Sequence, residues 1–134
     1  MGADDAFPPP SRGSILVADD EPHIRRVLTT LLRNAEFQVW EACDGAEAWA
    51  LVDSPHPIDL AILDLMMPKA TGLEVLARMR RHPRHARTPV IILTAKGQDT
   101  DRQEALSGGA DDFLTKPFSP KKLLLRIREI LSER

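Results

Sequence analysis

The sequence of 134 residues contains no tyrosine, few aromatic residues and a single cysteine. With Cys43 alone, an internal disulfide bond is excluded, and the composition is consistent with a reducing compartment. No apolar run approaches the roughly 18 to 20 residues that span a bilayer, and residues 1–12 lack the apolar stretch of a signal peptide. The sequence also has no large excess of positive or negative residues, because the formal net charge is only -2. We therefore expect a cytoplasmic protein without a membrane segment and without the overall field that favours nucleic acid.

The composition, with 43% apolar and 28% charged residues, is typical of a soluble globular domain. The length allows one domain with a buried core and leaves no room for a second of ordinary size. Residues 1–12 contain Asp4, Asp5 and the run Pro8-Pro9-Pro10, a composition that favours a loose tail. We expect residues 13–134 to form the folded domain.

Short apolar runs alternate with segments of helical periodicity along the whole domain. Five such pairs favour an α/β fold, a doubly wound parallel five-stranded sheet with helices on both faces, because parallel strands need helical crossovers. The predicted strands are 15–18, 37–40, 59–63, 89–93 and 112–115, and the predicted helices are 22–34, 44–52, 72–79, 99–106 and 120–131.

Polar residues follow four of the five predicted strands. Ligands of open parallel sheets bind at the carboxyl ends of the strands, where the sequence places Asp19, Asp20, Asp64, Thr94 and Lys116. Each has a simpler explanation: the acidic pair and Thr94 are common helix caps, and Lys116 could be a solvated lysine. Their occurrence at successive strand ends favours a shared site.

Three crowded carboxylates repel one another, and a divalent cation relieves that repulsion. Mg2+, with Mn2+ as the alternative ion, prefers oxygen ligands and often lies between carboxylates and a phosphoryl group. We expect Asp20 and Asp64 to bind the ion directly, Asp19 through water, and a backbone carbonyl at Met66 to complete the set. Asp64 would then attack phosphorus, a known reaction of carboxylates, while Lys116 and the Thr94 hydroxyl stabilise the phosphoryl oxygens.

Four segments together resemble the receiver domain of bacterial two-component response regulators. The resemblance implies a flavodoxin-like (βα)5 fold of strand order 2-1-3-4-5 and a histidine kinase or histidine phosphotransfer protein as phosphoryl donor to Asp64. It also implies that Ala95 joins Thr94 and Lys116 in binding the phosphoryl group, and that the peptide bond from Lys116 to Pro117 is cis. The matching segments are 15–21, 63–68 with Gly72, 90–95 and 116–118.

The resemblance assigns a switch to Thr94 and to an aromatic residue on the last strand, here Phe113. Phenylalanine has no hydroxyl, so Phe113 would act by packing alone, unless it is simply a core residue. By the same resemblance, Met66 and Lys96 occupy positions that in the family influence the water attacking the phosphoryl group. Neither is a carboxylate or an amide suited to orienting water, so we expect a long-lived phosphoryl group.

The chain carries no recognisable output domain, so we expect a stand-alone receiver that signals to an effector protein through the region 98–132. A cluster of five arginines and two histidines suggests nucleic acid, but no interleaved aromatic residues accompany it, which favours a solvated face and no direct nucleic-acid binding. The cluster consists of Arg78, Arg80, Arg81, Arg84, Arg87, His82 and His85.

Two other functions remain as alternatives to a phosphorylated signalling domain that is not an enzyme. The first is a degenerate receiver, an interaction module that is never phosphorylated. The second is an aspartate-nucleophile phosphatase, although such enzymes usually carry an Asp where this chain has Met66. A nucleotide-binding fold is disfavoured, because no glycine-rich loop follows the first strand.

Overall fold

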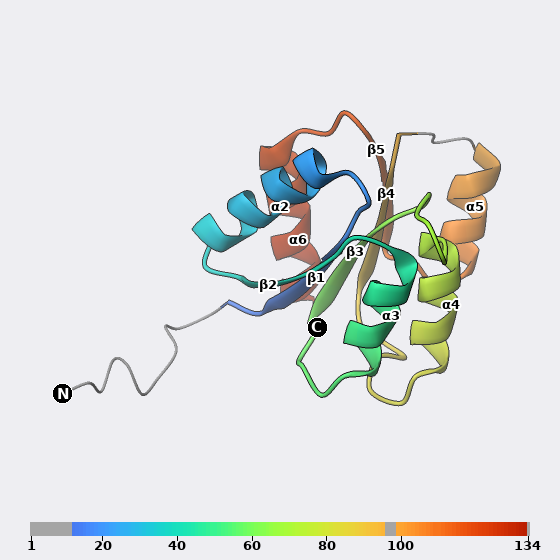
Figure 1. Ribbon diagram of the computed structural model, residues 1–134. Coiled ribbons are helices and arrows are strands. Elements are labelled where there is room, and N and C mark those ends of the chain that lie inside the picture. Colours follow the sequence, from blue (N-terminus) through green and yellow to red (C-terminus); the bar gives the residue numbers. More distant parts are fainter. Residues whose placement is uncertain (1–11, 96–98, 134) are drawn as a thin grey trace.

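The computed structural model describes residues 12–95 and 99–133, which form one parallel sheet flanked by helices (Figure 1). The five strands are hydrogen-bonded in the order β2-β1-β3-β4-β5, as the resemblance implies, and the fold is flavodoxin-like. None of the described helices is long and apolar enough to cross a membrane. The strands are β1 (Ser14–Ala18), β2 (Gln38–Ala42), β3 (Leu60–Asp64), β4 (Val90–Thr94) and β5 (Asp112–Thr115), and the helices are α2 (Pro22–Asn34), α3 (Gly45–Asp53), α4 (Gly72–Arg81), α5 (Asp99–Ser107) and α6 (Pro120–Ser132).

All ten predicted elements are present, with small shifts at their ends. Strand β2 begins and ends later than the predicted range 37–40, because the Phe37 N–H donates to the Leu32 carbonyl at 3.0 Å and so closes the preceding turn. Strands β3 and β4 each extend one residue further than predicted. Asp64 and Thr94 are therefore the last residues of their strands, held by the sheet rather than by the following loops.

The sheet is buried on both faces, which explains why its central strands are continuous apolar runs. Successive residues of β1 enter opposite layers: Ile15 and Val17 pack with α2 and α6, whereas Leu16 and Ala18 pack on the side of α3, α4 and α5. Figure 1 shows these two groups of helices on opposite faces of the sheet. The central strands therefore give a rigid base to the residues at their carboxyl ends.

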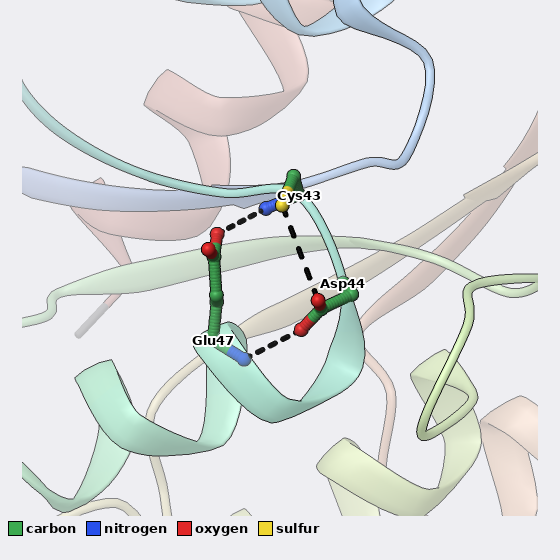
Figure 2. A group of neighbouring side chains, drawn as sticks. All are labelled: Cys43, Asp44 and Glu47. Atoms are coloured by element: carbon green, nitrogen blue, oxygen red, sulfur yellow. Dashed lines mark hydrogen bonds between the residues drawn. The ribbon is translucent and has the colours of Figure 1, made fainter.

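Side-chain caps fix the starts of two helices on the second face. Asp44 accepts from the Glu47 N–H, while the Glu47 carboxylate accepts from the Cys43 N–H, both at 2.8 Å (Figure 2). At the start of α4, Thr71 and Glu74 form a complete capping box, in which each side chain accepts from the backbone N–H of the other residue. Hydrogen bonding to Glu47 raises the pKa of the Cys43 thiol, which disfavours the reactive thiolate. The cluster of Cys43, Asp44 and Glu47 is thus explained as a helix start.

Helix α4 begins directly above the end of β3 because its first residue is a glycine. The Gly72 N–H donates to the Leu65 carbonyl at 3.0 Å, and a Cβ atom at this position would overlap the carbonyl oxygen of Asp64. The missing side chain therefore sets how closely α4 approaches the Asp64 loop.

The substitution Gly72→Ala should lower the free energy of unfolding by about 1 to 3 kcal/mol, because the methyl group meets backbone that has little room to move. Urea denaturation followed by circular dichroism measures this loss. The control Ala77→Ser, at an exposed position of the same helix, should cost no more than about 0.5 kcal/mol. Equal stability of Gly72→Ala and the native chain would contradict the close approach.

Candidate functional site

The strand ends bring two carboxylates and one ammonium group into a nearly closed cluster. Asp19 follows β1 and is 1% exposed, Asp64 ends β3 and is 4% exposed, and the side chain of Lys116, after β5, is 8% exposed. The Lys116 Nζ atom lies 2.8 Å from Asp19 Oδ2 and 3.4 Å from Asp64 Oδ2. Lysine therefore bridges two carboxylates that burial would otherwise leave in mutual repulsion.

A third carboxylate contacts the same ammonium group. Glu21 Oε1 lies 3.3 Å from Lys116 Nζ, and the Glu21 side chain is 57% exposed. The Lys116 ammonium donates hydrogen bonds to Glu21 and Asp64, whereas Asp19 Oδ2 is held by charge attraction and has no hydrogen-bond partner among the described residues. Glu21 is not among the predicted site residues, although its place directly after the acidic pair is a usable signal.

Backbone groups hold the carboxylates in place. Asp19 Oδ1 accepts from the Glu21 N–H at 2.9 Å, and Asp64 Oδ1 accepts from the Met66 N–H at 3.3 Å. The Arg25 guanidinium donates to the Asp19 carbonyl at 2.6 Å, which ties the first turn of α2 to the end of β1. Each buried carboxylate thus has one oxygen on the backbone and the other near Lys116.

The geometry suits a divalent cation. Asp19, Asp20 and Asp64 each offer a carboxylate oxygen, and these oxygens lie within 4.8 Å of one another. Two of the carboxylates are buried and Asp20 is exposed, so the cluster is open to solvent on one side. Oxygen donors with an excess of negative charge over the single Lys116 ammonium are the ligand type that Mg2+ prefers.

The pKa of Asp64 is raised to about 6: burial is the largest cause and the nearby Asp19 carboxylate adds to it, while Lys116 and the Met66 N–H lower the pKa. For Lys116, burial lowers the pKa, but the short contact with Asp19 and the attraction of Asp19 and Asp64 outweigh it. The pKa of Lys116 therefore lies above its ordinary value. In the absence of a cation, the cluster favours a charged lysine and disfavours a fully ionised Asp64.

The other predicted site residues occupy different surroundings. Thr94 ends β4 and is buried, whereas the next residue, Ala95, is exposed. Met66, beside Asp64 in the chain, is 57% exposed. The peptide bond from Lys116 to Pro117 is cis.

Of the two remaining predicted site residues, Phe113 and Lys96, the structure describes only Phe113. Phe113 is buried in the layer formed with α3, α4 and α5, which matches its interpretation as a core residue and also the inward position of a packing switch. Lys96 lies outside the described residues, so its predicted influence on the attacking water stays a prediction.

The fold and the strand-end cluster define a flavodoxin-like α/β domain with an acidic, lysine-bridged site at the carboxyl edge of its sheet. The family model of the response regulator receiver domain matches residues 15–128. The chain belongs to this family and is a receiver domain of two-component signalling.

A curated relative and two solved structures illustrate the similarity. The chain is 42% identical over 117 residues to the transcriptional regulatory protein SrrA of Staphylococcus aureus; this match covers 87% of the chain but 47% of the relative, so the chain spans about half of that protein. The Francisella response regulator 1452 receiver domain is 34% identical, with a TM-score of 0.82 over 91% of this chain and 98% of that one. The receiver domain of sensor histidine kinase PA1611 from Pseudomonas aeruginosa, a structure with a magnesium ion coordinated in the active site cleft, is 27% identical, with a TM-score of 0.82 over 90% and 98% of the two chains.

Replacement of Asp64 by the uncharged isostere in Asp64→Asn should stabilise the cation-free protein. The pKa of Asp64 is raised by folding, so the folded state favours the protonated form, and ionisation of Asp64 above about pH 6 costs stability. We expect a gain of about 1 to 2 kcal/mol at pH 7.5, which shrinks as the pH falls from 6 towards 4.

Urea denaturation in EDTA at several pH values tests this expectation. The exposed-site control Glu104→Gln on α5 should leave the stability nearly unchanged at every pH. A loss of stability in Asp64→Asn at pH 7.5 would show that the Lys116 contact outweighs the repulsion.

Proposed function

We propose that this chain receives a signal as a phosphoryl group on Asp64, donated by the phosphohistidine of a histidine kinase or a histidine phosphotransfer protein. The observation that carries this proposal is the strand-edge cluster, in which Lys116 bridges the buried Asp19 and Asp64. A carboxylate at the end of a rigid strand, beside a positive charge, is suited to attack phosphorus. A receiver domain of the PA1611 kinase, with magnesium in its cleft, has the same fold.

Residues of this chain would hold a divalent cation and the incoming group. Asp19, Asp20 and Asp64, with a backbone carbonyl at Met66, would hold Mg2+, or Mn2+ as the alternative ion; when bound, the ion neutralises negative charge on the oxygens around phosphorus. An Asp64 oxygen forms the bond to phosphorus while the bond from phosphorus to the donor imidazole nitrogen breaks, and the imidazole keeps the electron pair. Lys116 then exchanges a carboxylate partner for a phosphoryl oxygen.

The phosphoryl group would change the packing around the strand ends. Thr94 and Ala95 lie at the end of β4, where the Thr94 hydroxyl and the Ala95 backbone would bind phosphoryl oxygens beside Lys116. Phe113, on the neighbouring strand β5, is already inside the layer below α5. We propose that Thr94 and Phe113 form the switch, with Phe113 acting through packing because it lacks a hydroxyl.

The signal would leave through the region 98–132, which contains α5, β5 and α6, to an effector protein. An exposed leucine on each helix, Leu106 and Leu125, supports this assignment of a protein-binding surface. We propose that the protein acts in the cytoplasm and that residues 13–134 form the receiver domain. Residues 1–12 are the proposed tail, of which 1–11 lie outside the described residues. In this proposal the chain is a signalling domain, not an enzyme, that assists its own phosphorylation and dephosphorylation, and neither direct nucleic-acid binding nor a membrane is part of its action.

No observation favours either alternative function, the degenerate receiver or the aspartate-nucleophile phosphatase. A degenerate receiver would not need two buried carboxylates kept beside a buried lysine, an arrangement that is costly without a use. An aspartate-nucleophile phosphatase would need an acid at position 66, where this chain has an exposed methionine.

Incubation with acetyl phosphate and Mg2+ should add one phosphate-sized mass to the intact protein, because Asp64 becomes the nucleophile. The native chain should lose this gain in EDTA and recover it with Mn2+, and Asp64→Asn should show no gain. Intact-protein mass spectrometry at early times makes the measurement, with Glu104→Gln as a control that remains competent. An equal gain in Asp64→Asn would reject Asp64 as the acceptor.

The phosphoryl group on Asp64 should persist for minutes or longer, since neither Met66 nor Lys96 orients an attacking water. Met66→Asn should shorten this lifetime several-fold by supplying an amide beside Asp64. Mass spectrometry after removal of acetyl phosphate follows the decay. The control Leu125→Asn, at an exposed residue on α6, should decay like the native chain, and a native half-life of seconds would refute the prediction.

A further inference from the structure

The chain carries an acid-free segment of unusual length. Residues 75–98 contain five arginines and one lysine but no aspartate or glutamate. This segment covers most of α4, the following loop and β4. The strand is buried, so the arginines are concentrated at the end of α4 and in the loop. Basic residues at a helix C-terminus commonly offset the helix dipole. This is the simpler explanation for Arg78, Arg80 and Arg81, which lie in the last turn of α4.

Three of the basic residues have mostly buried side chains, which corrects the prediction of a uniformly solvated face. One of them is His82, whose side chain is 11% exposed and whose Nε2 atom lies 3.5 Å from Asp53 Oδ1. Arg80 donates to the Gly109 carbonyl at 2.7 Å and to the Thr88 carbonyl at 2.8 Å, and only 20% of its side chain is exposed. His85 is buried, with Nδ1 3.0 Å from the Thr88 hydroxyl. Arg80 and His85 hold the loop together, so the backbone that carries the other arginines is fixed.

The other four arginines are exposed. Arg84 donates to the Ser54 carbonyl at 2.6 Å, which joins the loop to the end of α3. Among the described residues, Arg78, Arg81 and Arg87 form no ion pair with a carboxylate. Three guanidinium groups therefore present uncompensated charge on a rigid surface.

An aromatic residue lies within this surface, contrary to the expectation from the sequence. The Arg78 guanidinium lies 5.1 Å from the centroid of the Trp49 ring, and His82 packs edge-on against the same ring at 6.1 Å. Strand β3 and its two flanking loops separate Trp49 from the arginines in the sequence, so the pattern of residues does not show the contact. The cation–π contact orders Arg78 before any ligand binds.

Further along the loop, the surface is hollowed. A depression of about 650 Å3 is lined by Arg84 and Arg87 together with Pro83, Ala86 and Thr88. The wall is therefore partly apolar and partly cationic. Such a hollow accommodates short acidic side chains together with the apolar parts of their segment.

We infer that Arg78, Arg81, Arg84 and Arg87, with Trp49, form a docking surface for an acidic peptide segment of a partner protein. The guanidinium fork binds a carboxylate through two parallel hydrogen bonds, and several ordered forks select a segment with several Asp or Glu residues. Below, these five residues are called the arginine surface.

Nucleic acid fits this surface less well than an acidic peptide. Single-stranded nucleic acid gains much of its affinity by stacking bases on free aromatic faces, but Arg78 lies over the Trp49 ring and His82 packs against it. The four arginines also come from one short segment, residues 78–87, which makes a compact spot rather than a track along a phosphate backbone.

The arginine surface lies away from the Asp64 site. Helix α4 starts at Gly72, beside the Asp64 carbonyl, and ends at Arg81, which is about 15 Å further on for a helix of ten residues. In Figure 1, the loop between α4 and β4 lies at the end of the sheet where β3 and β4 begin, opposite to the carboxyl ends of these strands. Docking should therefore be independent of phosphorylation, unlike an effector that binds the region 98–132.

A labelled peptide of ten residues, half of them glutamate, serves as the probe in fluorescence anisotropy with the full chain. The native chain should bind it at low salt and lose affinity as NaCl is added, since the contacts are between charges near the surface. The triple variant Arg78→Gln, Arg81→Gln, Arg87→Gln should bind at least tenfold more weakly. None of these arginine side chains hydrogen-bonds within the described loop, so the variant should remain folded, with a urea midpoint only slightly below the native one because the contact of Arg78 with Trp49 is lost.

The matched control removes three exposed cations from α6 by Lys121→Gln, Lys122→Gln and Arg128→Gln and should retain the native affinity. Equal weakening in both triple variants would mean that net charge alone drives binding, which would overturn the arginine surface. A single-stranded oligonucleotide of equal charge that binds more tightly than the peptide would overturn the choice of partner.

Affinity for the peptide should also be the same for Asp64→Asn and for the native chain treated with acetyl phosphate. A change of more than threefold on phosphorylation would contradict the separation of the two sites. Failure of phosphorylation itself leaves the result of the peptide experiment unchanged, so the two proposals are tested separately.

Discussion

The repulsion between two buried carboxylates, relieved by one buried ammonium group, is the constraint on which the rest of this structure depends. Asp19 and Asp64 are nearly inaccessible to water, and Lys116 lies within 3.4 Å of both. Such a cluster is worth little as a source of stability, because the desolvation of charges offsets much of their attraction. The surrounding fold must therefore supply the stability that holds it.

The fold supplies that stability through a sheet covered on both faces. The three central strands β1, β3 and β4 are almost fully buried, and two of them carry the acidic residues at their carboxyl ends. Gly72 lets α4 begin against the Asp64 carbonyl, and the Arg25 contact fixes the loop after β1. The charged side chains are thus mounted on the most rigid backbone in the molecule, where their mutual distances are set by strand spacing rather than by loops.

The sequence predicts where a residue lies when its location follows from backbone position, and it does not predict contacts that depend on the direction of a side chain. The residues at the ends of apolar runs identified Asp64 and Lys116, since parallel strands end at one edge of a sheet. The contact of Glu21 with Lys116, the inward turn of Arg80 and the position of Trp49 below Arg78 depend on tertiary packing between segments that are distant in the chain. No local periodicity encodes them, which is why the basic cluster was interpreted as a solvated face.

Differences in burial among the helices indicate where a new charge at Asp64 would act. Helix α6 buries Leu123, Ile127 and Ile130, whereas α5 buries only Ala105 among its described residues. Two polar contacts supplement this weak packing: Arg102 donates to the Phe113 carbonyl at 3.3 Å, and Arg80 donates to Gly109 just after the helix. Helix α5 is therefore held mainly by contacts of its C-terminal end and of Arg102 with β5. In the chain, α5 follows β4, the strand that ends in Thr94. Among the described helices, α5 costs least to displace, and because α4 is packed through Val75, Leu76 and Met79, such a displacement would leave the arginine surface at the far end of α4 in place.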